Sequence, residues 1–423
     1  MWPHVRCRSL PDHPERRPTR RSAPDGRAAP PPGRAGGGAG APRPRRRGDL
    51  GTDRRGPRGI QAGGAQEVRR WPVRPRGGVT VKTSALEDLV RATAEELSRG
   101  RRGAVVVGAV HDERTAVHGA APDTLFEIGS ITKSFTALAL ARLSLRGLVR
   151  LDEPLRELLP DGATVPERDG RAIELAHLAC HTSGLPRLPK GMFLRGLFSS
   201  DPYAACTREV VLNGLGRTSL RSVPGAGFHY SNLGAGLLGL ALARRAETDY
   251  DTLIRTEICR PLGMTDTQRT LDPDRTARLT PGHSRTGRPR SRWNLAALAG
   301  AGGLHSTVPD LLRFARAQLG EAPAELTEAI AVTRATEHRV NAAATVHAGW
   351  LSAPLPHGGA GQRLFFHNGG TGGYRSLLAV APDRRAAVVI LSANTVSVDN
   401  PGLRLLTRIG CPDSAPAAAG TGD

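Results

Sequence analysis

The chain has 423 residues and a formal charge of +20, because 59 Lys and Arg residues face 39 Asp and Glu residues. This length is enough for one large or two medium domains with a proper core. No stretch is long and apolar enough to cross a membrane, and no apolar run follows the N-terminal arginines as it would in a secretory signal. Both features favour a cytoplasmic protein.

Cysteine usage favours the same compartment. The five cysteines are odd in number and widely scattered, and they show neither a pairing pattern nor zinc-ligand spacing. They are Cys7, Cys180, Cys206, Cys259 and Cys411. A reduced protein without a structural metal is expected.

Most of the excess positive charge lies in residues 1–80, which hold 19 arginines and only 6 acidic residues. Rich in Arg, Pro and Gly, this segment cannot bury enough apolar surface to fold and is predicted to be disordered. A nucleic-acid-binding arm is one explanation. Solvated filler, or upstream sequence with the true start near Val79 or Val81, is the favoured one, because Trp2 and Trp71 are too few to stack bases. Nucleic acid is therefore not expected as a partner.

Ordered structure is predicted to begin with a helix near residue 84, where Ser84 and Glu87 match a capping box. A strand over 104–110 and a returning strand over 115–118 follow, with a charged turn between them. Near the other end of the chain, residues 363–367, 376–381 and 386–392 are strand-like, and 403–409 is predicted to be a closing helix.

Strand signals at both ends with helical sequence between them predict an α/β (α+β) fold: one antiparallel sheet flanked by helices, with a helical domain inserted in the middle. The sheet domain is expected over 81–141 and 300–412, and the helical domain over 142–299. Residues 413–423 are expected to be a flexible tail. The segment 270–300 resembles a long loop, and loops of that length are usually functional or mobile.

Lysine usage gives the first chemical signal. The chain has three lysines, Lys82, Lys133 and Lys190, among 56 arginines. Arg cannot lose its proton in a protein whereas a buried Lys can, so a retained Lys is a candidate for proton transfer. Lys82 and Lys190 lie in stretches expected to be exposed, which leaves Lys133.

Lys133 follows Ser130 by three residues, at the predicted start of a helix that continues to Gly147. Residues three apart share a helix face, so the amine can reach the hydroxyl. The free N–H groups of a helix N-terminus also suit a developing oxyanion. An ordinary N-cap serine beside a surface lysine is the plainer explanation, and this motif alone does not exclude it.

Two further motifs lie downstream. Tyr230-Ser231-Asn232 follows a Pro/Gly turn; a Tyr beside Ser and Lys can exchange protons, and an Asn can hold a carbonyl. Taken alone, this motif favours a Tyr that anchors the start of a helix through its hydroxyl. Residues 367–373 (HNGGTGG) end a predicted strand, where small residues let a substrate backbone lie close. A phosphate loop is excluded there, since no Lys-Ser/Thr follows the glycines.

In this order, Ser-x-x-Lys, Tyr-x-Asn and His-x-Gly resemble the three motifs of class C β-lactamases, D-alanyl-D-alanine carboxypeptidases and related esterases. The resemblance covers roughly residues 85–410. It includes four collinear segments that have no obvious part in catalysis, over 147–159, 177–186, 261–267 and 302–314. The chain is thus identified as a member of the serine β-lactamase and penicillin-binding protein family.

The resemblance implies a β-lactamase/transpeptidase-like fold and a serine hydrolase that forms an acyl-enzyme on Ser130 and needs no cofactor. Lys133 would be the base, Tyr230 would share proton transfer, and Asn232 would bind the substrate carbonyl. The backbone N–H groups of Ser130 and Gly370 would form the oxyanion hole. The third motif would line the substrate site with His367, Asn368, Gly369 and Gly370. Small molecules or short peptides are the expected substrates.

His367 and Asn368 stand where the family's lactamases have Lys and Thr, which help to hold the substrate carboxylate. A His is fully charged only below its ordinary pKa of about 6.5. Carboxylate recognition by the third motif should therefore be weaker, which disfavours an efficient β-lactamase and leaves esters, amides or small D-amino-acid peptides.

Two other functions compete with this one. A catalytically silent member that binds a ligand or partner is the main alternative, and the intact Ser130, Lys133 and Tyr230 argue against it. A nucleic-acid-associated protein acting through residues 1–78 is the second. The histidines His111, His118, His177, His181 and His305 lack metal-site spacing and are interpreted as structural or surface residues.

Overall fold

The structure, a computed structural model, describes residues 83–190 and 201–409. All of these lie in one compact unit, Gly78–Asp423. The Arg-rich segment 1–80 and the tail 413–423 fall outside the described residues, as do Cys7 and Cys411. Cys180, Cys206 and Cys259 are buried.

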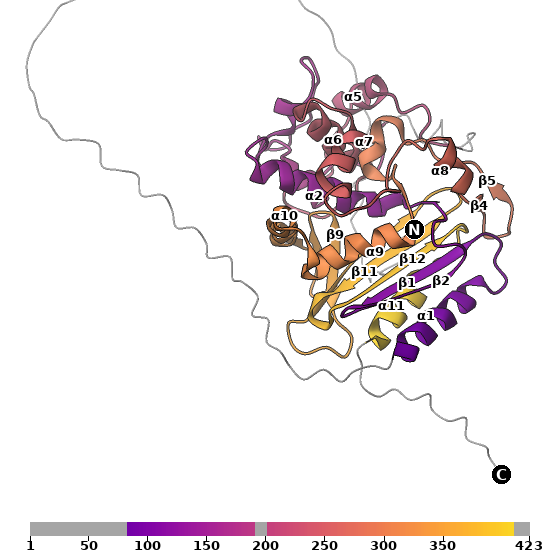
Figure 1. The fold of residues 1–423 in the computed structure, drawn as a ribbon. Helices are drawn as coiled ribbons and strands as arrows, with labels where there is room; N and C mark the ends of the chain where they lie inside the picture. The colour runs from indigo at the N-terminus through magenta and orange to yellow at the C-terminus, as the bar shows by residue number, and fades with distance from the viewer. Residues whose placement is uncertain (1–82, 191–200, 410–423) are drawn as a thin grey trace, which may run out of the picture. The chain divides into compact units, whose positions relative to one another are not determined.

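The elements are named as in Figure 1. The helices are α1 (Thr83–Ser98), α2 (Thr132–Leu145), α3 (Leu175–Ala179), α5 (Arg208–Gly216), α6 (Asn232–Arg245), α7 (Tyr250–Ile254), α8 (Pro273–Arg278), α9 (Val308–Arg316), α10 (Ala324–Ala335) and α11 (Asp399–Arg408). The strands are β1 (Val105–His111), β2 (Arg114–Gly119), β3 (Phe126–Glu127), β4 (Gly282–His283), β5 (Pro289–Arg290), β6 (His305–Ser306), β7 (Glu337–Arg339), β8 (Thr345–His347), β9 (Trp350–Pro354), β10 (Arg363–Gly370), β11 (Arg375–Ala381) and β12 (Ala386–Ser392).

One eight-stranded antiparallel sheet joins the two ends of the described chain, with the strand order β2-β1-β12-β11-β10-β9-β8-β7. Strand β1 pairs directly with β12, so that Val105 lies opposite Ser392. The pattern of strands at both ends of the sequence, with a helical region between them, is therefore present in the structure. The expected fold class is confirmed by the structural comparisons reported below.

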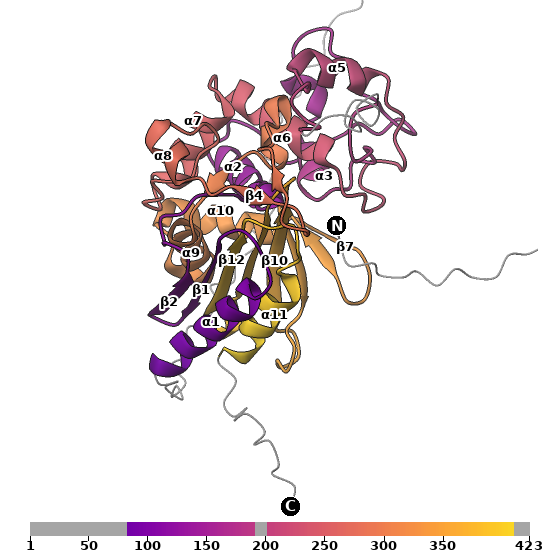
Figure 2. The same cartoon turned by 90° about the vertical axis from the view of Figure 1, so that its right-hand side faces the viewer.

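Helices cover both faces of the sheet (Figures 1 and 2). On one face, α1 and α11 pack on alternate residues of β1, β11 and β12, forming an apolar core that includes Val107, Leu377 and Ile390. On the other face lies α9. There Gly108 of β1 leaves room for α9, because a Cβ at that position would lie 2.5 Å from a methyl carbon of Val308.

Helix α2 is buried almost all round, between the sheet and the helical region. Its Phe135 ring stacks on Phe314 of α9 at 4.2 Å between centroids, and Phe314 in turn stacks near Trp350 of β9 at 6.2 Å. Burying an aromatic side chain of this size contributes about 2–3 kcal/mol. These contacts hold the start of α2, and with it the residues just before it, at a fixed place above the sheet.

Several local expectations differ from the structure. Helix α1 already includes Thr83, so Ser84 lies within its first turn rather than before it. Segment 270–300 is not one loop: it carries α8, the β4–β5 hairpin and the first residues of a 3₁₀ turn over 296–301. Strands β7 to β9 were not predicted at all, because each is short and none has the alternating pattern of a longer strand.

Candidate active site

Ser130 lies in a short 3₁₀ turn, Gly129–Ile131, immediately before α2 rather than in the α-helix itself. Strand β3 pairs with β6 and is followed almost directly by this turn. Gly129 adopts φ +51, a left-handed conformation that favours glycine. Lys133, in the first turn of α2, still falls on the same side as Ser130, and its Nζ lies 3.0 Å from Ser130 Oγ. The predicted Ser–Lys proximity is therefore present.

Three neutral acceptors surround the Lys133 amine: Ser130 Oγ at 3.0 Å, Asn232 Oδ1 at 3.0 Å and the Ala301 carbonyl oxygen at 2.6 Å. Burial, followed by the positive charge of Arg187, holds the pKa of Lys133 well below its usual range. A neutral amine donates two protons and keeps one lone pair. With donation to Asn232 and Ala301, that lone pair faces the Ser130 hydroxyl.

Tyr230 lies on the other side of the serine, where its hydroxyl donates to Ser130 Oγ at 2.7 Å. The next residue, Ser231, caps α6 and fixes this stretch, since its Oγ accepts from Gly234 N–H and donates to the Pro186 carbonyl. Burial raises the pKa of the Tyr230 hydroxyl above its usual value. The phenol is therefore a proton donor in the resting site, and Lys133 is the better base.

Asn232 is the first residue of α6 and joins two parts of the site. Its Oδ1 accepts from Lys133, and its Nδ2 donates to the hydroxyl of Tyr203 at 3.1 Å. The Tyr203 ring lies 5.2 Å from that of Trp293. Asn232 is thus held in one orientation by partners on both ends of its amide, as an orienting residue requires.

The third motif is divided between the two faces of β10. His367 is buried, and its Nδ1 contacts the Asn368 carbonyl at 2.8 Å, which sets the proton on Nδ1. Burial, with the nearby Lys133, lowers the pKa of His367 to about 3. The imidazole is therefore neutral throughout the physiological range. The loss of positive charge at the third motif is thus more complete than the ordinary pKa of His suggested. Asn368 is not brought to the cluster: its amide donates to Asp399 at the start of α11.

Gly369 and Gly370 sit against the serine turn. A Cβ on Gly369 would lie 2.1 Å from the Ile128 carbonyl oxygen, so that position accepts only glycine. Thr371 N–H bonds to Tyr374 across the β10–β11 turn. Because hydrogen-bonding direction alternates along an antiparallel strand, the exposed Gly370 points its N–H away from β11. The Gly370 N–H is therefore not used in pairing with β11, and it lies beside Gly129.

Ala301, Tyr203 and Arg187 lie at the site but were not predicted from the sequence. His181 was predicted only as a structural or surface residue, and it also lies at the site. His181 is buried, with its ring centroid 4.4 Å from that of Tyr230 and its Nδ1 accepting from Ser231 N–H at 3.3 Å. The guanidinium carbon of Arg187 lies 5.4 Å from the centroid of the same ring. His181 lies within the segment 177–186 and Arg187 directly follows it. From the sequence, this segment was noted only as collinear with relatives.

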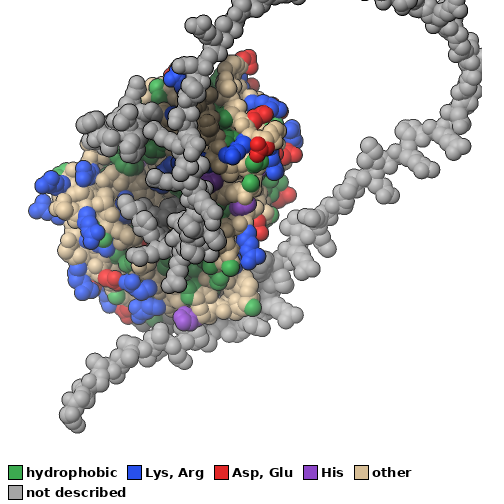
Figure 3. Space-filling model, turned by 180° about the vertical axis from the view of Figure 1, so that it is seen from behind, with side chains coloured by type: hydrophobic (Ala, Val, Ile, Leu, Met, Phe, Trp, Pro, Cys, Tyr) green, Lys and Arg blue, Asp and Glu red, His purple; other side chains and the backbone are tan. Residues whose placement is uncertain are grey.

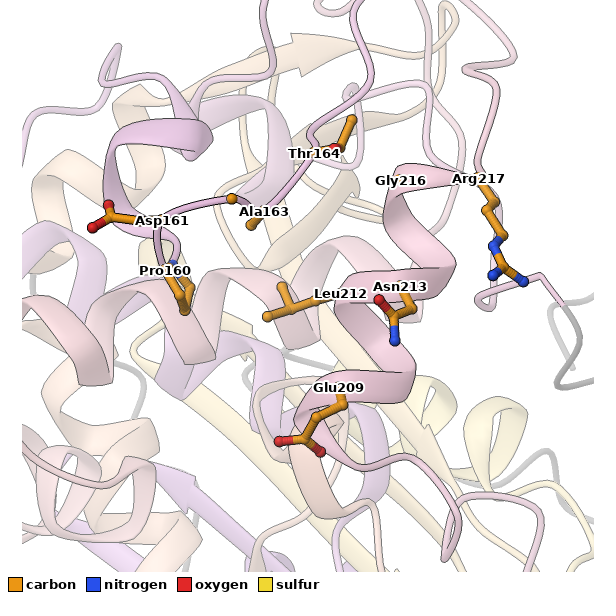
Figure 4. Close-up of a pocket in the computed structure, with 10 residues that line it drawn as sticks. Pro160, Asp161, Ala163, Thr164, Glu209, Leu212, Asn213, Gly216 and Arg217 are labelled. Atoms are coloured by element: carbon orange, nitrogen blue, oxygen red, sulfur yellow. The ribbon is translucent and has the colours of Figure 1, made fainter.

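Among the described residues, no group of three or more His, Cys, Asp or Glu side chains is placed to hold a metal ion. A surface cavity of about 450 Å³ lies between 160–164 and α5, and it is drawn in Figure 4. Asp161, Glu209 and Arg217 line it, and it includes none of the cluster around Ser130. Its open, mixed-charge lining does not suggest catalysis.

Basic side chains on the face seen in Figure 3 are scattered along its edges, with acidic ones between them. Binding to a nucleic-acid backbone generally uses a basic patch or stripe. The visible part of this face does not present one. Within 83–190 and 201–409, no helix has both the length and the apolar character needed to cross a bilayer.

A helix-covered antiparallel sheet that carries a Ser, a Lys and a Tyr in hydrogen-bond contact is an arrangement suited to a serine hydrolase. The model of the Beta-lactamase family matches residues 86–409, and the chain belongs to this family. The expectations of family, fold class and serine hydrolase activity are confirmed.

Among curated relatives, the D-alanyl-D-alanine-carboxypeptidase/endopeptidase AmpH of Escherichia coli K12 is 32% identical over 281 residues, which cover 64% of this chain and 71% of AmpH. A penicillin-binding protein of Bacillus subtilis is 26% identical over 289 residues, or 64% of this chain and 61% of the relative.

Solved structures agree on the fold. A class C β-lactamase superimposes with a TM-score of 0.67 at 19% identity, covering 80% of this chain and all of the other. A β-lactamase/D-alanine carboxypeptidase from Yersinia pestis, complexed with citrate, gives 0.65 at 25% identity and covers 77% of this chain and 97% of the other.

Proposed function

We propose that this protein hydrolyses an ester or amide bond of a small acyl compound or short peptide through an acyl-enzyme on Ser130. The observation that carries the proposal is the position of Ser130 Oγ, 3.0 Å from Lys133 Nζ and 2.7 Å from the Tyr230 hydroxyl. A nucleophile in contact with both a neutral base and a proton donor has what acyl transfer requires.

In the acylation step, Ser130 Oγ attacks the substrate carbonyl carbon while its proton passes to Lys133 Nζ. The carbonyl oxygen becomes an oxyanion, which the N–H groups of Ser130 and Gly370 would stabilise. Tyr230 then donates a proton to the departing oxygen or nitrogen, and Lys133 returns its proton to Tyr230. The C–O or C–N bond breaks and leaves an ester on Ser130.

Deacylation reverses these roles with water as the nucleophile. Water attacks the ester carbonyl, its proton passes through Tyr230 and Lys133 to Ser130 Oγ, and the carboxylic acid leaves. Asn232 takes part only by orientation, because its amide holds Lys133 and, in the proposal, the substrate carbonyl. No group outside this chain is required.

The neutral His367 favours esters and amides over β-lactams as efficient substrates. A cationic side chain at the third motif would attract the carboxylate of a β-lactam, and this imidazole, with a pKa of about 3, is neutral in the physiological range. The carboxypeptidase/endopeptidase name of the Escherichia coli relative supports a peptide substrate. We therefore expect the third motif itself to add little to the binding of a β-lactam carboxylate.

Hydrolysis of p-nitrophenyl butyrate by the full chain and by Ser130→Ala tests the proposal. Removing a nucleophile typically lowers the rate on the order of 10³–10⁶-fold. Ser144→Ala, a second serine near the end of α2, is the matched control and should keep full activity. Mass spectrometry after treatment with a fluorophosphonate should place the label on Ser130.

Two results would contradict the proposal. Equal activity of Ser130→Ala and the parent protein would mean that another residue is the nucleophile. Absence of both hydrolysis and labelling, for esters, D-alanyl peptides and β-lactams alike, would instead favour the catalytically silent family member.

A further inference from the structure

Arg187 is held rigidly at the edge of the Ser130 cluster. Its backbone carbonyl oxygen accepts from the N–H groups of Asn232 and Leu233, at 3.0 and 3.1 Å, where α6 begins. Its side chain is exposed and lies over the Tyr230 ring, with the guanidinium carbon 5.4 Å from the ring centroid. The backbone anchor fixes where this cation can reach.

The charge of Arg187 has no counterion among the described residues. Other arginines of the helical region pair with carboxylates: Arg142 with Glu257 at 3.3 Å, and Arg245 with Glu153 at 2.6 Å. Among the described residues, the contact found for the Arg187 guanidinium is the one with the face of the Tyr230 ring. Its field nevertheless reaches the cluster, since it contributes to the lowered pKa of both Lys133 and His181.

The third motif does not supply a cation to the Ser130 cluster. His367 is neutral and buried, and Asn368 is turned to Asp399. Arg375 packs against Gly370, but its Nη1 donates to the carbonyl oxygens of Thr371 and Tyr374. Arg375 therefore stabilises the β10–β11 turn, whereas Arg187 is an exposed cation beside the ring of Tyr230.

We propose that Arg187 binds an anionic group of the substrate, a carboxylate near the scissile bond, and so makes this enzyme selective for acidic esters and peptides. The inference rests on the proposed function of Ser130 and adds its substrate class. An unpaired guanidinium forms two parallel hydrogen bonds with a carboxylate, which fixes orientation as well as charge. In this proposal Arg187 would bind the carboxylate that a lysine of the third motif helps to hold in the family's lactamases.

Matched pairs of esters test this selectivity. The first pair is p-nitrophenyl butyrate and the mono-p-nitrophenyl ester of glutaric acid, which differ by a carboxylate on the acyl group. The second is phenyl acetate and 3-carboxyphenyl acetate, which place the carboxylate on the leaving group. The parent enzyme should prefer the anionic member of at least one pair, and the preference should shrink as salt is added.

Arg187→Gln should lower kcat/KM for the preferred anionic ester on the order of tenfold relative to its neutral partner, as expected for one charge contact near a protein surface. Arg187→Lys should keep most of the preference. Arg217→Gln removes another exposed arginine, one that lines the cavity of Figure 4, and should leave the ratio unchanged. An unchanged ratio in Arg187→Gln would overturn the inference.

Failure of the proposed function gives a different result. In that case neither member of either pair is hydrolysed, whatever residue stands at 187. The anion site is then tested without turnover, by calorimetric titration of the full chain with glutarate. Binding that weakens about tenfold in Arg187→Gln but not in Arg217→Gln supports the site, and equal binding by all three proteins overturns it.

Discussion

The Lys133 amine and the Ser130 hydroxyl lie 3.0 Å apart across the junction between a 3₁₀ turn and α2. The other two partners of the amine, Asn232 Oδ1 and the Ala301 carbonyl oxygen, are neutral acceptors from distant parts of the chain. Because no carboxylate is among these three partners, nothing in this contact set stabilises the ammonium form by ion pairing. The chemistry proposed for Ser130 depends on this arrangement.

The first prediction concerns the pH dependence of activity. Lys133 must be neutral to act as base, so kcat/KM should fall as pH decreases through its lowered pKa. Arg187→Gln removes the second cause of that lowering, which raises the pKa of Lys133 and moves the acid limb of the profile to higher pH. Profiles measured with p-nitrophenyl butyrate, a neutral ester, separate this effect from substrate binding. An acid limb at the same pH in both proteins would contradict the assignment of Lys133.

Tyr230→Phe should lower kcat on the order of 10²–10⁴-fold, because it removes the donor 2.7 Å from Ser130 Oγ. The ring position stays filled, so the fold should be retained. Tyr250→Phe is the matched control: it also removes a buried hydroxyl, one bonded to Thr136 at 2.7 Å outside the cluster. Circular dichroism and steady-state kinetics on both variants check the prediction, which fails if the two lose similar activity.

Gly129→Ala should damage both stability and activity. This position combines φ +51 with a close approach, since a Cβ would lie 2.7 Å from Gly370 N. Gly263→Ala is the control, because Gly263 also has a positive φ, +64, but open space around it. Gly263→Ala should lower the free energy of unfolding by about 1 kcal/mol, from backbone strain alone. Urea unfolding should show a larger loss for Gly129→Ala, accompanied by loss of hydrolysis; equal losses would mean that Gly129 and Gly370 are not in contact.

Glu127 should make stability fall with rising pH. This buried carboxyl accepts from Trp293 N–H at 3.0 Å, and burial raises its pKa from 4.5 to about 7. Since the folded state holds the proton more tightly than the unfolded state, Glu127 destabilises the fold as pH rises from 4.5 through 7. Over this range the free energy of unfolding should fall by about 3 kcal/mol.

Glu127→Gln mimics the protonated carboxyl and should remove this part of the pH dependence. Urea unfolding at pH 5 and pH 8 measures it: the variant should gain stability relative to the parent at pH 8 and little at pH 5. Glu328→Gln, which changes an exposed carboxylate on α10, should leave both values as in the parent. A parent protein equally stable at the two pH values, and matched by Glu127→Gln, would refute the raised pKa.

Local sequence was sufficient to propose the Ser130–Lys133 pair, because three residues of helical chain bring two side chains to one face whatever lies around them. It also predicted strands β1, β2, β11 and β12 closely, since buried strands with turn residues on both sides are distinctive in sequence. The small-residue requirement at 369–370 was visible as a pair of glycines.

Contacts over long sequence separations were decided only by the tertiary structure. The Ala301 carbonyl reaches Lys133 from 168 residues away, and a backbone oxygen leaves no trace in residue type. Whether His367 is charged depends on its burial, and whether Asn368 faces the substrate depends on which side of β10 it occupies. Arg187 is one arginine among 56 in the sequence. Only the fold distinguishes it, by placing its guanidinium over the Tyr230 ring with no carboxylate partner in 83–190 or 201–409.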